Sequence, residues 1–279
     1  MRILILGGSG MLGHMLLKTL QPRHDARVTL RHSLEHYCQW PLFHAANSFS
    51  GVDVRSPASL VQAISQFRPE AVVNCVGLVK QQGHAEDVLE NLEINAAAPH
   101  RIAKLCRDAE TRLIHISTDG VFSGRRGMYT EEDIADAEDL QGRAKHLGEL
   151  DEPHCMTLRT SIVGRELARR SGLLEWFLAQ NRPVKGFKRA VFSGLTTIEL
   201  SRAIEMLLTK FPKACGLYHV SSEPIDKYTL LHLFRDHFGV KIDILRDEEI
   251  VIDRSLNSSR FRQEFDYRPP TWPDMVKEL

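Results

Sequence analysis

The feature that most constrains the fold of this chain is a glycine-rich turn near its first residue. A short apolar run, Ile3–Leu6, leads into this turn, whose residues are Gly7, Gly8, Ser9, Gly10, Met11, Leu12 and Gly13. An amphipathic helical pattern follows over Met11–Leu20, so the segment predicts a strand, a turn and a helix. Gly7 would permit the tight turn, Gly10 would let the backbone approach a diphosphate, and Gly13 would let helix and strand pack closely.

The N–H groups at the start of such a helix face a bound anion. We therefore expect a dinucleotide to bind the glycine loop through the following residues: Gly7, Ser9, Gly10, Met11, Leu12 and Gly13. The alternative is a tight turn without a ligand, but the strand before it and the helix after it favour binding.

Short apolar runs and helical patterns alternate through the rest of the first half. Strands are expected at Arg27–Leu30, Ala71–Val76 and Leu113–Ser117, and helices at Pro57–Phe67 and Ile94–Asp108. This rhythm predicts an α/β fold, a Rossmann-type doubly wound parallel sheet with helices on both faces.

The alternation becomes less regular after Gly164. We expect residues 1–164 to form an NAD(P)-binding domain, and residues 165–279 to form mainly a smaller C-terminal α/β substrate lobe, with some later segments returning to the first domain. Segment 123–139 reads as a loop, helices are expected near 140–150, 172–179, 198–211 and 227–238, and strands near 156–158, 217–220 and 242–245. Three prolines, the last at Pro273, should delay the final helix until about Asp274.

Composition argues against several classes of protein. The 279 residues include 36 basic and 36 acidic side chains, so the formal net charge is zero, and neither nucleic acid nor an anionic membrane is expected as a partner. No apolar run is long enough to cross a bilayer, and the apolar start is too short for a signal peptide. The five cysteines are scattered without a CxxC pair, which favours a reducing cytoplasm.

Two further kinds of site are not expected. His32 and His36 have the spacing of one helix face, but no cysteine or carboxylate completes a metal-ligand set with them. The sequence has no GxSxG nucleophile turn, which argues against a serine hydrolase.

The end of the second expected strand bears on the choice of dinucleotide. NAD-selective sites usually place an aspartate or glutamate there, on the ribose diol, whereas this chain has Arg31. Arg31 could receive a 2′-phosphate, which favours NADP(H) over NAD(H), and the alternative is a solvated surface arginine.

The segments that follow the next expected strand supply more candidate ligands. Cys75, Val76 and Gly77 end that strand at the sheet edge where a cofactor should lie, and Gly77 would permit a close approach. Asn95 opens the alanine-rich helix, and it could bind the cofactor or simply occupy a helix terminus.

Three segments in the middle of the chain carry a family resemblance. They are Ser117–Gly124 (STDGVFSG), Tyr129–Asp133 (YTEED) and Gln141–Glu149 (QGRAKHLGE). They resemble the dTDP-4-dehydrorhamnose reductase family of the extended short-chain dehydrogenase/reductase superfamily, whose pattern runs STDYVFDG, YxExD and YGxSKxxGE. Similarity continues into LRTSIVG from Leu158 and RPP from Arg268, so the resemblance covers nearly the whole chain.

The resemblance implies reduction of a nucleotide-linked 4-keto-6-deoxy sugar by hydride from NAD(P)H, in the synthesis of a surface polysaccharide. It implies that the Thr118 hydroxyl holds the carbonyl oxygen and that Lys145 binds the nicotinamide ribose, although Lys145 could also be a solvated helix lysine. Asp53 and Val54 would contact the adenine ring, but an aspartate there can be an ordinary turn residue.

The resemblance is less specific about the sugar nucleotide. The loop Phe192–Thr197, Trp176 and Arg260 are candidate contacts to it, and each could instead serve the core or the surface. A nucleotide sugar is the expected partner, and a homodimer is one of the assemblies that stay open.

Position 141 departs from the family pattern. A tyrosine four residues before Lys145 would lie on the same helix face and give the proton to the product oxygen, but this chain has Gln141. A carboxamide donates hydrogen bonds but releases no proton near neutral pH, and general acid catalysis typically contributes ~10²–10⁴-fold.

Three interpretations stay open. The protein could be a reductase that recruits Tyr129, His146 or a water as its acid, it could bind sugar nucleotide and cofactor without turnover, or Gln141 could be an introduced substitution. An epimerase or dehydratase of the same superfamily is not favoured, because those enzymes also normally need the tyrosine.

Overall fold

A computed structural model describes residues 1–78, 87–168 and 170–279. In these residues seven strands form one parallel sheet in the order β11-β6-β5-β4-β1-β2-β3. The strands are β1 (Arg2–Leu6), β2 (Asp25–Leu30), β3 (Ser48–Ser50), β4 (Ala71–Asn74), β5 (Arg112–Thr118), β6 (Cys155–Thr160) and β11 (Gly216–His219). The order reverses at β1, which is the topology of a Rossmann-type doubly wound sheet and confirms the predicted fold class.

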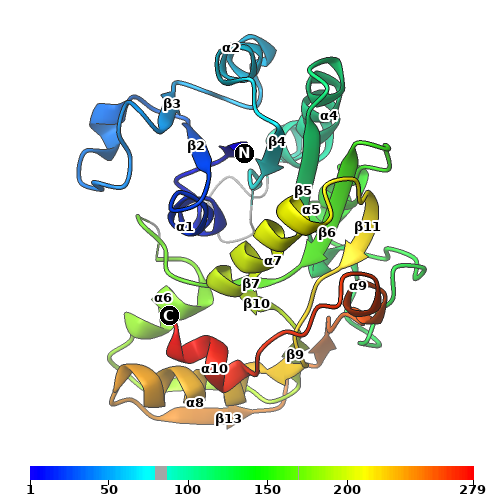
Figure 1. Ribbon diagram of the computed structural model, residues 1–279. Coiled ribbons are helices and arrows are strands. Elements are labelled where there is room, and N and C mark those ends of the chain that lie inside the picture. The colour runs from blue at the N-terminus through cyan, green and yellow to red at the C-terminus, as the bar shows by residue number, and fades with distance from the viewer. Residues whose placement is uncertain (79–86, 169) are drawn as a thin grey trace.

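Helices cover both faces of this sheet (Figure 1). One face carries α1 (Met11–Leu20) and α7 (Thr197–Lys210), and the other carries α2 (Pro57–Phe67), α4 (Ala98–Asp108) and α5 (Leu140–Leu147). Side chains of β1 alternate between the two apolar cores, with Ile3 and Ile5 on the α1 side and Leu4 and Leu6 on the α2 side. A strand buried on both faces reads as a continuous apolar run, which is why β1 was recognisable in the sequence.

The helix expected at 94–108 begins earlier than its sequence pattern suggested. A short helix α3 (Val88–Asn91) and a π-helical turn η2 (Leu92–Ala97) run directly into α4. Pro99 lies in the first turn of α4, and a proline has no N–H to continue a regular helix ladder. The wider turn of the π-helix precedes that break, and such turns are frequent at functional sites.

The C-terminal lobe is built from short strands and helices beneath the sheet (Figure 1). Its strands form two small sheets, β8 (Val184–Phe187) with β13 (Ile244–Asp247), and β9 (Ala190–Phe192) with β12 (Ile225–Asp226) and β14 (Ile252–Asp253). Its helices are α6 (Leu173–Leu178), α8 (Lys227–Phe238), α9 (Ser259–Glu264) and α10 (Trp272–Lys277). The remaining elements are the strand pair β7 (Ile162–Val163) and β10 (Leu195–Thr196) and the 3-10 turns η1 (Leu34–Tyr37) and η3 (Asp119–Val121).

Segments after residue 164 return to the large sheet. Strand β11 pairs with β6 at its edge, and α7 packs against α1. The division into residues 1–164 and 165–279 stays a prediction. Strand β11 and helix α7 lie after residue 164 in the chain, yet in space they belong with the large sheet.

The strand expected at Ala71–Val76 ends at Asn74, because its pairing with β1 stops at Leu6, before the glycine turn. Two boundaries near the C-terminus also differ from the sequence expectation. The last helix begins at Trp272 rather than near Asp274, because Pro273 lies in the first turn, where its missing N–H costs no hydrogen bond. The strand expected at 242–245 lies at Ile244–Asp247, because pairing with Val184–Phe187 sets its position. In the described part of the chain, we find no helix long and apolar enough to cross a membrane.

Candidate active site

The glycine loop joins β1 to α1 at the carboxyl edge of the sheet. Gly7 has a left-handed φ of 83°, and a Cβ on Gly13 would lie 2.1 Å from the Gly7 carbonyl oxygen. Gly10 differs, because a Cβ there would meet only that same oxygen, at 3.3 Å, and the residue is exposed. Gly7 and Gly13 are therefore required by the turn itself, whereas Gly10 keeps the outer surface of the loop free of a side chain.

The start of α1 fits an anionic ligand. Gly10 is its N-cap, and no side chain of the described residues caps the helix. Leu12 is 4% exposed and packs in the core, so only its backbone faces the loop, while Ser9 and Met11 are half-buried. Uncapped N–H groups behind a bare glycine surface are what a diphosphate requires.

The next pair of strand ends brings Arg31 and Asp53 together. The Nε of Arg31 lies 3.6 Å from the Asp53 carboxylate, which also accepts hydrogen bonds from Arg55 Nη2 at 2.6 Å and from its backbone N–H at 2.9 Å. The side-chain hydrogen bonds of Arg55 hold the pKa of Asp53 below its usual range. Val54 is buried in the core. Arg55 was missed in the sequence, where its only signal is a basic residue two positions after Asp53.

The end of β4 meets Lys145. Lys145 is only 7% exposed, and this burial lowers its pKa to about 8. Its ammonium group donates to the Ile116 carbonyl at 3.1 Å. A Cβ on Gly77 would lie 2.9 Å from the Lys145 Nζ, so the lysine side chain packs directly against this glycine and a larger residue would displace the ammonium group. Val76 touches the glycine loop, since its Cγ2 lies 3.0 Å from a Cβ placed on Gly7, and burial raises the pKa of Cys75 to about 12.

Asn95 and Gln141 hold the backbone that follows β4. Asn95 is fully buried, accepts from the Leu78 N–H at 3.0 Å and donates to the Leu78 carbonyl at 3.1 Å and to Asn91 at 2.8 Å. Gln141 donates from Nε2 to the same Leu78 carbonyl at 3.0 Å. Both side chains thus hold the backbone at Leu78, beyond the end of β4, and the amide group of Gln141 is engaged with that backbone.

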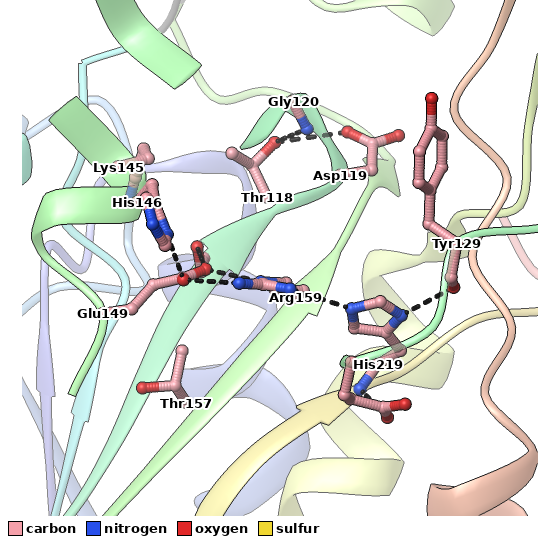
Figure 2. A network of polar contacts seen from close by, with 12 residues as sticks. Thr118, Asp119, Gly120, Tyr129, Lys145, His146, Glu149, Thr157, Arg159 and His219 are labelled. Carbon is pink, nitrogen blue, oxygen red and sulfur yellow. Dashed lines mark hydrogen bonds and ion pairs between the residues drawn. The ribbon is translucent and has the colours of Figure 1, made fainter. Parts of the chain in front are cut away.

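Thr118 begins a tight turn at the end of β5. Its hydroxyl accepts from the Gly120 N–H at 3.0 Å and donates to the Asp119 carboxylate at 3.2 Å (Figure 2). Helix α5 presses against this turn, because a Cβ on Gly142 would lie 2.2 Å from the Gly120 carbonyl oxygen. The contact brings position 141, the neighbour of Gly142, beside the Thr118 turn.

The two side chains considered as substitute acids are engaged elsewhere. Tyr129 is 5% exposed, stacks on Phe122 with ring centroids 4.2 Å apart, and accepts from the Arg126 N–H at 3.2 Å. The side chain of His146 is 48% exposed and bonds Glu149 at 2.8 Å. Neither contacts the Thr118 hydroxyl, so the structure does not support either of them as the proton donor.

A buried polar network supports α5 and the strand ends. The Glu149 carboxylate accepts from Arg159 Nε at 2.7 Å and Nη2 at 2.8 Å, and Arg159 also contacts His219, whose other ring nitrogen bonds the Tyr129 carbonyl (Figure 2). Burial acts to raise the pKa of Glu149, but hydrogen bonds from Arg159 and His146 hold it below its usual range. Burial lowers the pKa of His219 to about 4, so the ring is neutral in this network.

The expected contacts to the sugar nucleotide are less well grouped. Phe192 and Ser193 are buried in the lobe, so the Phe192–Thr197 loop does not offer them to a ligand. Trp176 is 38% exposed on α6, and the guanidinium of Arg260 stacks over Tyr218 at 4.7 Å. Substrate contacts by Trp176 and Arg260 stay predictions.

Comparison with known families agrees with this geometry. Residues 1–240 match the family described as the RmlD substrate binding domain. The chain belongs to this family. The resemblance seen in its sequence is thereby confirmed.

Three curated relatives show how far the similarity extends. A dTDP-4-dehydrorhamnose reductase of Aggregatibacter actinomycetemcomitans is 25% identical over 303 residues, covering 100% of this chain and 98% of that protein. The probable low-salt glycan biosynthesis reductase Agl14 of Haloferax volcanii is 30% identical over 164 residues, covering 57% and 52%. Methionine adenosyltransferase 2 subunit beta of Rattus norvegicus is 29% identical over 153 residues, covering 53% and 41%. The chain thus spans about half of the last two relatives or less.

Solved structures share the fold. A dTDP-4-dehydrorhamnose reductase from Bacillus anthracis in complex with NADP superposes with a TM-score of 0.81 at 18% identity, covering 99% of this chain and 97% of that one. The Bordetella bronchiseptica enzyme WbmG in complex with NAD superposes with a TM-score of 0.79 at 22% identity, covering 99% and 91%. At these identities the likeness shows the fold.

Proposed function

We propose that this protein is a nicotinamide-dinucleotide-dependent reductase of a nucleotide-linked 4-keto-6-deoxy sugar. The observation that carries the proposal is the meeting of three features at one sheet edge: the glycine loop, the buried Lys145 beside Gly77, and the Thr118 turn pressed against α5. Relatives that match nearly their full length are named dTDP-4-dehydrorhamnose reductase.

Each group has a defined task in this reaction. The N–H groups at the start of α1 bind the diphosphate, and the Lys145 ammonium donates to the hydroxyls of the nicotinamide ribose. The Thr118 hydroxyl donates to the ketone oxygen and stabilises the charge that grows there. The bound cofactor supplies the hydride that reduces the ketone carbon.

We also propose that the cofactor is NADP(H). Arg31 and Arg55 both lie at the Asp53 carboxylate beyond the second strand, and two guanidinium groups suit a 2′-phosphate. Similar folds bind NADP in the Bacillus protein and NAD in WbmG, so the choice depends on these local charges.

The test is to mix the purified protein with NADPH and a panel of 4-keto-6-deoxy nucleotide sugars and to follow cofactor absorbance and product by mass spectrometry. We expect oxidation of NADPH that depends on the sugar and is faster than with NADH. Absence of turnover with every sugar would contradict the proposal. The cytoplasmic location expected from the sequence and the homodimer that the sequence left open belong to the same proposal, and cell fractionation and light scattering test them.

A second function is favoured by Gln141. Its amide is hydrogen-bonded to the Leu78 carbonyl and cannot act as a general acid. One relative is named as a subunit of another enzyme, methionine adenosyltransferase 2. A sugar-nucleotide- or NADP(H)-binding subunit without turnover would bind NADPH in calorimetry yet oxidise none with any sugar.

A further inference from the structure

A reductase without the tyrosine at position 141 needs another source for the proton that completes the alcohol. We propose that Asp119 supplies it, passing a proton through the Thr118 hydroxyl to the product oxygen. The proposal rests on the reductase function above. It assigns the proton donor of this chain to the residue that follows Thr118, rather than to position 141.

The geometry of the turn supports this route. Thr118 Oγ1 and Asp119 Oδ1 are 3.2 Å apart, and the Gly120 N–H donates to the same hydroxyl at 3.0 Å. These two contacts hold the Thr118 hydroxyl beside Asp119 at the carboxyl end of β5. Gly142 of α5 packs against the Gly120 carbonyl oxygen. This contact fixes the turn, and with it Thr118 and Asp119, against α5.

The surroundings of Asp119 keep part of it protonated near neutral pH. Burial raises its pKa to about 6, and it does so against the opposing charges of Arg254 and Lys227 and the hydrogen bond from Thr118. Arg254 is held by the Phe122 carbonyl at 2.9 Å and lies 3.8 Å from Asp139, and Lys227 opens helix α8 of the C-terminal lobe. A carboxyl group that titrates near the working pH is suited to general acid catalysis.

The step balances without any group beyond the cofactor and solvent. The reduced nicotinamide dinucleotide gives a hydride to the ketone carbon, and the electron pair of the carbon–oxygen π bond moves to oxygen. When Asp119 is protonated, its O–H donates to Thr118 Oγ1, which leaves the Thr118 proton free to face the ketone oxygen. That oxygen takes the proton of Thr118 Oγ1 while Thr118 takes the proton of the Asp119 carboxyl group. Solvent then returns a proton to the Asp119 carboxylate.

The first experiment compares kcat of the wild type and Asp119→Asn from about pH 5 to about pH 9 at saturating NADPH and sugar. We expect wild-type kcat to fall as the pH rises above the pKa of Asp119, and the variant to lose ~10²-fold in kcat without this pH dependence and with unchanged NADPH affinity. Asp136→Asn, which removes an exposed carboxylate bonded to Ser123, should behave as the wild type.

A double variant separates a chemical role from a structural one. Gln141→Tyr restores the family's proton donor, so it should return turnover to Asp119→Asn, whereas a damaged fold would not be rescued. An Asp119→Asn enzyme within about threefold of the wild type, or one with the same pH profile, would overturn the assignment while leaving the reductase function intact. A wild type that reduces no sugar would overturn both. Loss of the pH dependence in Lys145→Met but not in Asp119→Asn would assign the proton to Lys145 instead.

A second readout does not depend on activity. Carboxyl ¹³C shifts of labelled aspartate in the ligand-free protein, assigned by comparison with Asp119→Asn, should show Asp119 titrating well above ordinary aspartates. Thr118→Val removes a hydrogen bond that favours the ionised form, so the midpoint should rise further. A titration midpoint of Asp119 in the range of ordinary aspartates, unchanged by Thr118→Val, would contradict the proposed pairing of Asp119 with Thr118.

Discussion

The two ends of the candidate cofactor site are built differently. At the diphosphate end, Gly7 and Gly13 are required by backbone geometry, and Arg31 is exposed on the rim. At the nicotinamide end, Lys145 is buried and the supporting network of Glu149, Arg159 and His219 lies inside the molecule. The glycines at the first end are required by the backbone of the fold. The second end depends on side chains that can change without unfolding the sheet. Gln141, at the position where the family pattern has a tyrosine, is one such side chain.

The largest effect on stability should come from the buried network. Arg159→Met leaves the Glu149 carboxylate buried without its main partner, which typically costs about 3–5 kcal/mol. Arg31→Met breaks only the exposed pair with Asp53 and should cost less than about 1 kcal/mol. Urea unfolding of both variants measures the difference, and equal costs would break the contrast between the two ends.

The same network should make stability depend on pH. His219 has a pKa near 4 in the folded protein and near 6.5 when unfolded, so the unfolded chain takes up more protons and stability falls as the pH drops between these values. The loss should approach about 3 kcal/mol at the acid end of this window. His219→Gln, which can keep both hydrogen bonds without titrating, should remove most of this loss in urea unfolding at about pH 7 and about pH 4.5. An unchanged dependence would mean that other groups cause it.

Two glycines of the loop should separate folding from binding. Gly13→Ala places a Cβ against a backbone oxygen and should destabilise the fold by about 1–3 kcal/mol, whereas Gly10→Ala should cost less than about 1 kcal/mol. Gly10→Ala should nonetheless weaken NADPH binding at least about tenfold in calorimetry, because its methyl group occupies the outer surface of the loop. Full affinity in Gly10→Ala would show that the ligand does not approach the loop there.

The smallest effect concerns the choice of cofactor. Arg31→Met should weaken NADPH binding about tenfold, about 1.4 kcal/mol, with NADH binding unchanged. Arg55→Met should act in the same direction, since Arg55 shares the Asp53 carboxylate with Arg31. Equal losses for both cofactors would assign these arginines to general attraction rather than to the 2′-phosphate.

Much of the fold was readable because its signals are local. The apolar run of β1, the glycines after it and the helical pattern of α1 lie within twenty residues, and each follows from backbone sterics or side-chain periodicity. Short strands such as β8 and β14 were missed, because pairing with distant segments rather than their own composition creates them.

The site divides in the same way. The sequence by itself determined the glycine loop, because that loop is a matter of residue type and spacing. The family resemblance, also a property of the sequence, singled out Lys145 and the departure at Gln141. Only the tertiary structure decided that Asn95 and Gln141 hydrogen-bond the Leu78 backbone and that Arg55 joins Arg31 at Asp53. It also decided that the side chains of Tyr129 and His146 have other hydrogen-bond partners. These contacts join residues far apart in the chain or depend on where the buried backbone leaves hydrogen-bond partners, and no local pattern records them.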